Sequence, residues 1–473
     1  MAVVKPPIKE ITLPPRNAKV VPQTDVLVVG GGPAGIGAAI GAAEAGAHVV
    51  LAEHYGFLGG NATAGLVLTL ASYYTSPKPE KAENPGGPAL FPKVPSMGKP
   101  VIAGVLARIV ERLVKGGGAF APSEKTGFIV PFDPEAFKLA ALEMLGEAGV
   151  DLLLHAFASG VLAEDGLRGV VFETKSGPVV VRAQVVVDCT GDGDVAAFAG
   201  APFEVGREAD GLVQPMTLMF LMSGFARSKF ESYVKQHPEE WNGVQGLTTL
   251  MGEAVAKGEL NVPRENILFF GTTHDSDISV NSTRITDTLG TDVWDLTSSE
   301  LEGRRQITQL IAFLKKYVPG FEKAYLSQTA TYVCVRESRR VLGEYKLTAE
   351  DVLEAHKFSD VIAHGAYPID IHNPKGKGTV LKRVQAGEAY DIPLRCLVPL
   401  KVENLLVAGR CISGTHEALA SYRVMPISMA TGQAAGVCAA LACKNKQTPR
   451  IVKAEEVQRE LIRQGAYLEI KSD

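Results

Sequence analysis

The apolar positions near the start of the chain form short continuous runs that alternate with longer helical patterns. Val26 to Val29 are apolar and end at a glycine, which is typical of a buried parallel strand. The alanine-rich segment that follows predicts a helix, and His48 to Ala52 predict the next strand. Asp133 as N-cap and Pro134 in the first turn begin another helix, which ends before the strand pattern VDLLLHA. This alternation predicts an α/β fold on a parallel sheet.

The next segments complete this first region. Ile102 to Lys115 predict a helix, and the turn signals Asp165-Gly166 and Ser176-Gly177 separate the strands of a β-meander. Residues 73–100 carry seven prolines and predict an irregular loop, which would act as a lid or as a contact between subunits.

The pattern changes between residues 200 and 393 to longer, mixed strand and helix signals. Thr297 and Glu300 predict a capping box at the start of a helix that ends at Pro319-Gly320, and Thr348 with Asp351 predict another helix start. After Leu394 the α/β pattern returns. We therefore expect residues 1–200 and 394–473 to form one Rossmann-like domain, with residues 201–393 inserted as an α+β substrate domain.

The first predicted strand leads into a glycine motif that binds dinucleotides. Gly30, Gly32 and Gly35 form G-x-G-x-x-G, which permits a tight turn, a close approach to a pyrophosphate and close packing of helix on strand. Glu53 ends the next strand 18 residues later, where a carboxylate accepts hydrogen bonds from a ribose hydroxyl. The sequence therefore predicts a dinucleotide site.

Composition excludes several other classes of protein. The 46% hydrophobic and 21% charged content is that of a globular protein, and the formal net charge of −4 gives no reason to expect a nucleic-acid partner. The N-terminus lacks the apolar core of a signal peptide, and no run approaches the roughly 18 apolar residues that a membrane span needs. We therefore expect a cytoplasmic protein without a membrane partner.

Neither a metal nor a redox dithiol is expected. The six cysteines include no C-x-x-C pair, which argues against a zinc or iron–sulfur site and against a disulfide framework. His274, Asp275 and Asp277 lie within four positions of one another, a spacing that is more typical of a turn than of a metal site.

Two later segments decide which dinucleotide is bound. A strand ends at Thr190-Gly191-Asp192, and another ends at Gly409-Arg410 before a long helix that begins near Pro426. Gly191 to Ala196 also reads G-x-G-x-x-A, so a nicotinamide site is the rival interpretation. A nicotinamide site needs a long helix after the motif, but Gly200 follows at once. It also needs a following strand that ends in a carboxylate residue, and none follows at the required distance. The distant glycine turns favour FAD.

Several longer stretches resemble a known family, among them GREADGLVQPMTLMF, VRESRRVLGEYKLTAEDVL, YPIDIHNP and GRCISGTHEALASYRVMPISMATGQAAG. The chain resembles the bacterial FAD-dependent oxidoreductases of the glutathione-reductase-like, two-motif superfamily, which are related to the flavin parts of heterodisulfide reductases and fumarate reductases. The resemblance implies that FAD is held by Gly30, Gly32, Pro33, Ala34, Gly35, Glu53, Gly59, Gly60, Asn61, Thr190, Gly191, Asp192, Gly409, Arg410, Met429 and Ala430.

The same resemblance implies details of flavin binding. The N-terminus of the helix after Pro426 would point at the flavin pyrimidine ring, where the amides of Met429 or Ala430 could stabilise a reduced, anionic flavin. In the succinate dehydrogenase relatives a histidine after the acidic strand binds the flavin covalently. The corresponding turn here, GGNATAG, contains no histidine, so non-covalent FAD is implied.

Candidate catalytic groups lie in the inserted segment and just after it. Arg336 and Arg339 could hold a carboxylate or phosphate, although surface or interdomain salt bridges are the alternative. Asp370 and His372 would share one face of an extended segment, where a carboxylate would raise the basicity of the imidazole. A structural contact is the alternative for this histidine. Two further candidates near the flavin helix, with turn fixation as their alternative, are His416 and Arg423.

These observations predict a flavoenzyme that transfers a hydride between a carbon of a small-molecule substrate and flavin N5. Dehydrogenation of an alcohol, an amine or a saturated C–C bond is the first expectation. Reduction of an activated C=C bond and an electron-transfer flavin subunit of a larger complex are the alternatives. A homo-oligomer is an open alternative to a monomer.

Overall fold

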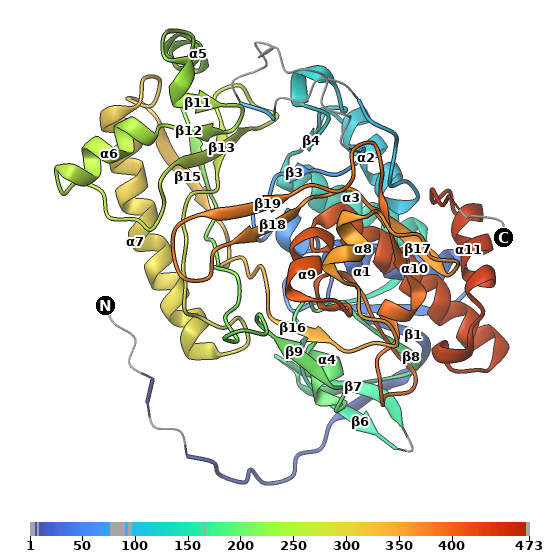
Figure 1. Cartoon of the computed structure of the whole chain (residues 1–473). Coiled ribbons are helices and arrows are strands. Elements are labelled where there is room, and N and C mark those ends of the chain that lie inside the picture. Colours follow the sequence, from blue (N-terminus) through green and yellow to red (C-terminus); the bar gives the residue numbers. More distant parts are fainter. Residues whose placement is uncertain (1–4, 7–8, 76–89, 93–96, 165, 470–473) are drawn as a thin grey trace.

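The computed structural model describes residues 5–6, 9–75, 90–92, 97–164 and 166–469. Its main sheet has five parallel strands in the order β5-β2-β1-β8-β21, and two antiparallel strands extend it from β8 (Figure 1). The parallel strands are β5 (Asp151–Leu153), β2 (Val49–Ala52), β1 (Lys19–Val29), β8 (Gly177–Asp188) and β21 (Leu405–Val407), and the added strands are β7 (Leu167–Thr174) and β6 (Phe157–Ala163). The Rossmann-like parallel core and the β-meander that the sequence predicts are confirmed.

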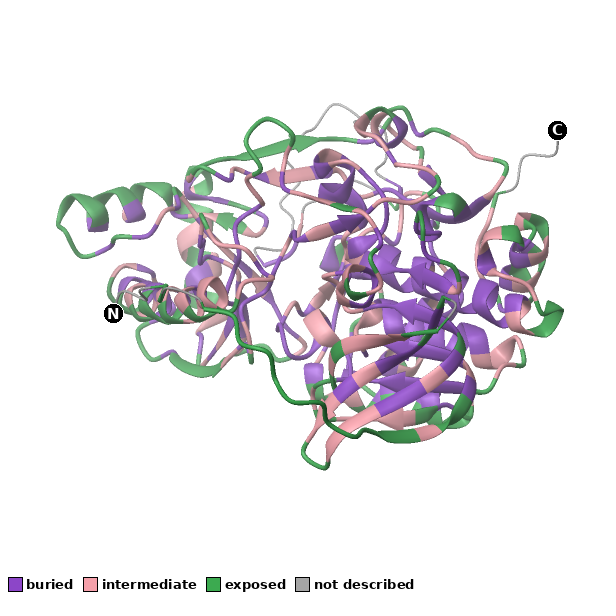
Figure 2. Cartoon of the chain, turned by 90° about the horizontal axis from the view of Figure 1, so that it is seen from below, coloured by how far each residue is buried: buried purple, intermediate pink, exposed green. Residues whose placement is uncertain are grey.

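Two helices, α1 (Pro33–Glu44) and α10 (Met425–Asn445), cross at close range beside this sheet. Their contact depends on glycine, because a Cβ at Gly432 would lie 2.0 Å from the Ala34 carbonyl oxygen and one at Gly37 would lie 2.2 Å from that of Met429. Figure 2 shows the buried character of this region. The close packing brings the N-termini of both helices to the same end of the sheet, beyond the carboxyl ends of β1 and β8.

The sequence predicts two further helices of this region, one from Ile102 and one after Asp133. The helix expected from Ile102 begins slightly later, at Val105, because Gly104 has a φ of +66°. The N-cap expected at Asp133 is confirmed, since its carboxylate accepts a hydrogen bond from Ala136 N at 2.8 Å. With these two, the further helices of this region are α2 (Val105–Lys115), α3 (Pro134–Glu147), α4 (Asp194–Phe198), α8 (Ala349–Leu353), α9 (His416–Tyr422) and α11 (Ala454–Arg463).

A second sheet lies to the left in Figure 1 and is wholly antiparallel, in the order β11-β12-β13-β14-β10-β15. Its own aromatic core includes Phe230, Trp241 and Phe269. The strands are β10 (Phe220–Ser223), β11 (Trp241–Asn242), β12 (Gln245–Gly246), β13 (Ile267–Gly271), β14 (Ile278–Val280) and β15 (Tyr325–Thr329), with helices α5 (Arg227–Gln236), α6 (Thr248–Ala256) and α7 (Val293–Tyr317). The domain boundaries at 200 and 394 stay a prediction.

The described residues also form four short antiparallel strand pairs. The hairpin of β18 and β19 lies between the two regions, because Arg423 bonds to the Asp370 carbonyl in β18 while Arg284 bonds to the hairpin turn. The pairs are β18 (Ile369–His372) with β19 (Thr379–Lys382), β9 (Phe203–Val205) with β16 (Arg339–Val341), β17 (Val361–Gly365) with β20 (Tyr390–Pro393), and β3 (Thr69–Leu70) with β4 (Val130–Pro131).

Three sequence expectations need comment. The capping box at Thr297 is wrong: α7 begins at Val293 with Asp292 as its N-cap, so Thr297 lies inside the helix and its hydroxyl bonds to the Val293 carbonyl. The capping box of Thr348 and Asp351 is confirmed. Most of the expected loop at 73–100 falls outside the described residues. Its described part includes Leu90, which is buried and accepts a hydrogen bond from Gly271 N.

One helix within the described part of the chain, α10, has the length and apolar composition of a membrane span, which corrects the expectation that no run has these properties. Of its most apolar window, 83% is buried inside the protein. Its apolar surface is therefore already covered by α1, the sheet and α11.

Candidate functional site

The first glycine turn has the backbone shape that the motif predicts. Gly30 has a φ of +101°, and a Cβ at Gly35 would lie 1.7 Å from the Gly30 carbonyl oxygen. A Cβ at Gly32 would meet nothing closer than 3.9 Å, so the space above this residue is open. Gly32 is also the N-cap of α1 and has no side chain to cap it, so the first-turn amides are free for an anion. The turn fits a pyrophosphate.

Glu53 supports this turn from the end of β2. Its carboxylate is buried and accepts hydrogen bonds from Gly31 N at 2.6 Å and Tyr55 N at 2.9 Å. Burial alone would raise the pKa of Glu53, but these bonds and the neighbouring His54 lower it below its ordinary value. The ionised carboxylate has lone pairs left to accept a hydrogen bond from a ribose hydroxyl, which is the role that the sequence predicts for Glu53.

The second glycine turn packs directly on the first. Gly59 has a φ of +113°, and its amide donates to the Gly31 carbonyl at 2.8 Å. A Cβ at Gly60 would approach the Gly32 Cα to 3.0 Å, so a larger residue would crowd the open space above Gly32. Asn61 follows, and its side-chain oxygen accepts a hydrogen bond from the Tyr332 hydroxyl at 2.7 Å.

The third turn follows β8 and is organised by Asp188, which the sequence analysis did not single out. The buried Asp188 carboxylate accepts hydrogen bonds from Thr190 and from Ala196 N. Burial raises its pKa to about 6. The helix that follows, α4, has only five residues, which agrees with the argument against a separate nicotinamide site.

Arg410 joins this turn to the one after β21. Its guanidinium donates to Asp192 Oδ1 at 2.8 Å and to the Val335 carbonyl at 2.6 Å. Gly409 precedes it with a φ of +80° and donates its amide to Thr431. The four turns that the sequence assigns to FAD therefore meet around the N-termini of α1 and α10.

The amides expected to face the flavin need correction. Helix α10 begins at Met425, and Ser428 N already bonds to the Val424 carbonyl. Met429 and Ala430 lie deeper in the helix, where their amides bond to carbonyls four residues earlier. The free donors are instead the amides of Met425 and Ile427, because Pro426 has none and Val424 provides no side-chain cap.

Residues 331–340 form a segment that lies along these turns, and we call it the strap. Its backbone and side chains contact the second glycine turn through Thr331 and Tyr332. Further along, Ser338 donates to Asp192 Oδ1 and Arg339 pairs with Asp194 at 2.8 Å. The strap therefore connects these glycine turns to Arg336, which lies in the sequence between these two groups of contacts.

Arg336 belongs to a cluster of four arginines around β18, of which Arg264 and Arg284 are buried and Arg336 and Arg423 are partly buried. It donates to the Pro215 carbonyl at 2.7 Å and to Thr217, and burial together with the charge of Arg423 lowers its pKa to about 9. Arg423 lies 3.7 Å from Asp370 Oδ2. The cluster, which we call the arginine cluster, consists of Arg264, Arg284, Arg336 and Arg423.

Asp370 and His372 lie side by side in this cluster, as their spacing predicts, with Oδ2 and Nε2 3.5 Å apart. The expected rise in histidine basicity is wrong. Burial and the charge of Arg336 outweigh Asp370 and lower the pKa of His372 to about 3. Burial would raise the pKa of Asp370, but His372, Arg423 and Arg336 hold it well below its ordinary value. Both groups are therefore deprotonated at neutral pH.

Two other candidates lie outside the arginine cluster. His416 is buried, and its Nδ1 lies 2.8 Å from Glu337, which also pairs with the buried Arg340 at 2.5 Å. Arg339 holds Asp194 and the Asp192 carbonyl at the third turn. Both residues thus have ion-pair partners in the protein, and the catalytic roles expected for them stay predictions.

Sequence reasoning missed three residues here: Arg264, Gln214 and Tyr332. Arg264 is buried and bonds to the Asn281 carbonyl, while Gln214 accepts a hydrogen bond from His372 N. The arginine stands in an ordinary turn sequence, VPREN, where no local pattern signals burial.

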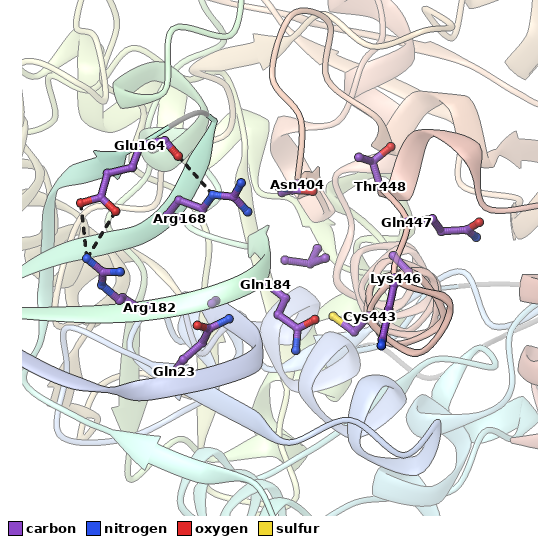
Figure 3. A pocket seen from close by; sticks show the side chains of 13 residues that line it. Gln23, Glu164, Arg168, Arg182, Gln184, Asn404, Cys443, Lys446, Gln447 and Thr448 are labelled. Atoms are coloured by element: carbon purple, nitrogen blue, oxygen red, sulfur yellow. Dashed lines mark hydrogen bonds and ion pairs between the residues drawn. The ribbon is translucent and has the colours of Figure 1, made fainter.

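Two other features do not contribute to the site. His274 contacts Asp133 at 3.6 Å, Asp275 contacts Arg227, and the described residues contain no group of three metal-ligating side chains. A cavity of about 660 Å³ lies near Arg182 and Lys446 (Figure 3). It opens beside the Ala183–Val185 part of β8, and no residue assigned to FAD or catalysis lines it.

Comparisons with known proteins identify the family. A search of curated proteins finds no match. Similar solved structures include a geranylgeranyl bacteriochlorophyll reductase-like protein from Thermoplasma acidophilum, with 14% identity, 94% and 84% of the two chains covered and a TM-score of 0.44. A p-nitrophenol 4-monooxygenase from Pseudomonas putida has 10% identity, 94% and 85% coverage and the same TM-score. At these values the similarity gives no information on the substrate. The model of the FAD-dependent oxidoreductase family matches residues 25–461, and the chain therefore belongs to this family and is an FAD-dependent enzyme.

Proposed function

We propose that the protein is a dehydrogenase that oxidises a small molecule bound between the N-terminus of α10 and the arginine cluster. FAD, when bound, supplies an acceptor for a hydride from the substrate. One observation supports the proposal above the others: Arg423 contacts Asp370 and is followed directly by the N-cap of α10. A substrate held by Arg423 would therefore lie next to the helix N-terminus that the family resemblance assigns to the flavin ring.

The glycine turns and helix termini would hold the cofactor without a covalent bond. The amides of α1 beside Gly32 would bind the pyrophosphate, and Glu53 would bind the ribose. The free amides of Met425 and Ile427 would stabilise negative charge on the flavin, because a helix N-terminus carries about half a positive charge. Tyr332 and Arg410 would fix the turns around it.

Asp370 is the proposed proton acceptor, and His372 is a positioning residue. Nδ1 of His372 lies 3.4 Å from an Arg284 nitrogen, which only donates, so Nδ1 accepts and the ring proton is on Nε2. This Nε2–H points to Asp370 Oδ2 at 3.5 Å. The imidazole therefore has no free lone pair for a substrate proton, while the ionised carboxylate does. The substrate would lose one hydride and one proton, and the proton would go to Asp370.

The reverse reaction, reduction of an activated C=C bond, is the second candidate, because the same groups could then deliver the proton. An electron-transfer subunit is less well supported. The cysteines in the described part of the chain form no disulfide, are buried or partly buried, and make no group that could ligate an iron–sulfur cluster.

The two half-reactions test these alternatives. The purified FAD-bound enzyme should lose its visible flavin absorption when the correct donor is added without oxygen. If no donor in a panel of alcohols, amines and acids does so, and an alkene acceptor instead restores the absorption of chemically reduced enzyme, the dehydrogenase assignment is wrong and the reductase takes its place.

A further inference from the structure

We propose that the substrate of this site is a dicarboxylate, bound by Arg264, Arg284, Arg336 and Arg423. The inference rests on the proposed function for the position of the site, and it adds the chemical class of the substrate. It is carried by the charge balance of the cluster and by hydrogen-bond donors within it that have no acceptor.

The charges of the cluster are far from balanced. Arg264 and Arg284 are 6% and 3% exposed, and neither has a carboxylate within ion-pair distance among the described residues. Arg336 likewise bonds to neutral oxygen atoms of Pro215, Thr217 and Asn281. Asp370, 3.7 Å from Arg423 and partly buried, is the carboxylate in ion-pair contact with the cluster. The exposed Glu265 acts on Arg264 and Arg284 only from beyond ion-pair distance. Four guanidinium groups against one contacting carboxylate leave an excess of about three positive charges, which is unfavourable unless a bound anion offsets it.

Unpartnered donors in the same place point to an acceptor-rich ligand. Within the described chain, Nε of Arg264, Arg284 and Arg423 are buried and donate to nothing. The side-chain amide nitrogen of the fully buried Gln214 is a fourth such donor. Three of the four residues contact Asp370 or His372: Gln214 bonds to His372 N, Arg284 to the His372 ring, and Arg423 to the Asp370 carbonyl. Arg264 contacts neither, but burial and the charge of Arg284 lower its pKa to about 10 while the charge of Asp370 opposes this shift. Buried polar groups in folded proteins nearly always have partners, so this concentration of orphan N–H groups is a site for an anion.

The contacts that do exist hold the arginines in place without neutralising them. Arg284 donates to the carbonyls of Gly376 and Gly378 in the β18–β19 turn, and Arg264 donates to the Asn281 carbonyl. These bonds fix the direction of each guanidinium group and leave its charge available. A planar guanidinium group that is held in a fixed direction in this way can bind a carboxylate with two parallel hydrogen bonds.

Carboxylate fits the proposed chemistry better than phosphate does. A carboxylate whose charge is neutralised by guanidinium groups withdraws electrons from the neighbouring carbon and makes its C–H easier to deprotonate. Asp370 lies in the cluster to receive that proton, whereas a phosphate cannot conjugate with the reacting carbon. Two carboxylates would reduce the excess charge from about three to about one, so we infer two.

Calorimetric titration of the FAD-bound enzyme tests this inference, with succinate, the neutral succinamide and inorganic phosphate as probes. Succinate should bind and succinamide should not. Arg264→Gln and Arg284→Gln should each weaken succinate binding about tenfold or more, because each removes a charged hydrogen bond. Arg450→Gln is the matched control, since it removes a positive charge that pairs with Glu344 and Glu403 elsewhere.

The possible outcomes separate this inference from the proposed function. Three results would overturn the inference that the substrate is a dicarboxylate: absence of succinate binding to the wild-type enzyme, equal binding of succinamide, or binding of phosphate alone. A neutral donor that bleaches the flavin while dicarboxylates do not bind would overturn it and leave the dehydrogenase intact. Should an arginine variant not fold, the comparison of succinate with succinamide on wild-type protein still decides the matter.

Discussion

Nε2 of His372 lies 3.5 Å from Oδ2 of Asp370, and the other ring nitrogen faces the Arg284 guanidinium. A neutral imidazole satisfies both neighbours, because it donates to the carboxylate and accepts from the arginine. A protonated ring would point a proton at a cation. The pair is therefore built to stay deprotonated, and this has a measurable effect on stability.

The first prediction concerns acid stability. The pKa of His372 is about 3 in the folded protein against an ordinary 6.5, so between these values the unfolded chain binds a proton that the folded chain does not. Stability should therefore be fully present above about pH 6.5 and fall as the pH drops, by up to about 1.4 kcal/mol per pH unit. His372→Gln should lose this part of the slope, as measured by urea unfolding from pH 7 to pH 4. If unfolding free energy depends on pH in the same way in both proteins, His372 does not have a lowered pKa in the folded state.

The second prediction separates cofactor binding from folding at the first glycine turn. Gly32→Ala should leave the stability of the FAD-free protein nearly unchanged, because its φ of −73° suits alanine and its Cβ would meet only open space. FAD should nevertheless bind at least about tenfold more weakly, since that space is where the pyrophosphate approaches. Gly35→Ala should damage both properties, because its Cβ collides with Gly30. Flavin fluorescence titration and thermal unfolding measure the two effects, and normal FAD affinity in Gly32→Ala would exclude this turn from the cofactor site.

The third prediction tests the contact of α1 with α10. In Gly436→Ala the new Cβ would lie 2.0 Å from the Ala38 carbonyl oxygen, so the helices must separate and stability should fall by about 1–3 kcal/mol. Gly252→Ala in α6 is the control, because its Cβ would meet nothing within 4 Å. That substitution should stabilise the protein by about 0.5–1 kcal/mol. Equal effects in denaturant unfolding would contradict the packing described for these helices.

The fourth prediction concerns Arg423. Arg423→Gln should retain FAD, because the glycine turns do not depend on this residue, and should lower kcat/KM about 100-fold by removing a charge-assisted contact to the substrate. Arg395→Gln, which breaks a surface pair with Asp360, should leave kcat/KM unchanged. If Arg423→Gln keeps full activity and normal FAD content, Arg423 does not contact the substrate.

Local patterns in the sequence were enough to predict the glycine turns and most of the first region. Three of these features depend only on neighbours within a few residues, so the sequence alone predicts them: the glycine spacing, the N-cap at Asp133 and the capping box of Thr348 and Asp351. The box at Thr297 failed because Asp292 forms the cap one turn earlier, bonding to Trp294 N and Asp295 N. Aspartate is also a good N-cap residue, and the two hydrogen bonds of the Asp292 carboxylate to first-turn amides start the helix at Val293.

The arginine cluster was predictable only in part for a different reason. Arg336 and Arg423 lie in distinctive sequence stretches, but Arg264 comes from the loop before β13 of the second sheet, and Gln214 from the segment before β10. Their meeting around His372 depends on how the β18–β19 hairpin lies between two regions that are far apart in the sequence. The lowered pKa of His372 follows from its burial and, after that, from the charge of Arg336, so the spacing of Asp370 and His372 alone gave the wrong direction.

The most direct test of the account is the visible flavin spectrum of wild-type protein and Asp370→Asn, recorded without oxygen during titration with a panel of dicarboxylates. The account predicts that at least one dicarboxylate bleaches the wild-type flavin, while Asp370→Asn keeps its FAD, still binds the same compound and is bleached at least about 100-fold more slowly. Equally fast bleaching in Asp370→Asn, or a wild-type flavin that only neutral donors reduce, would contradict it.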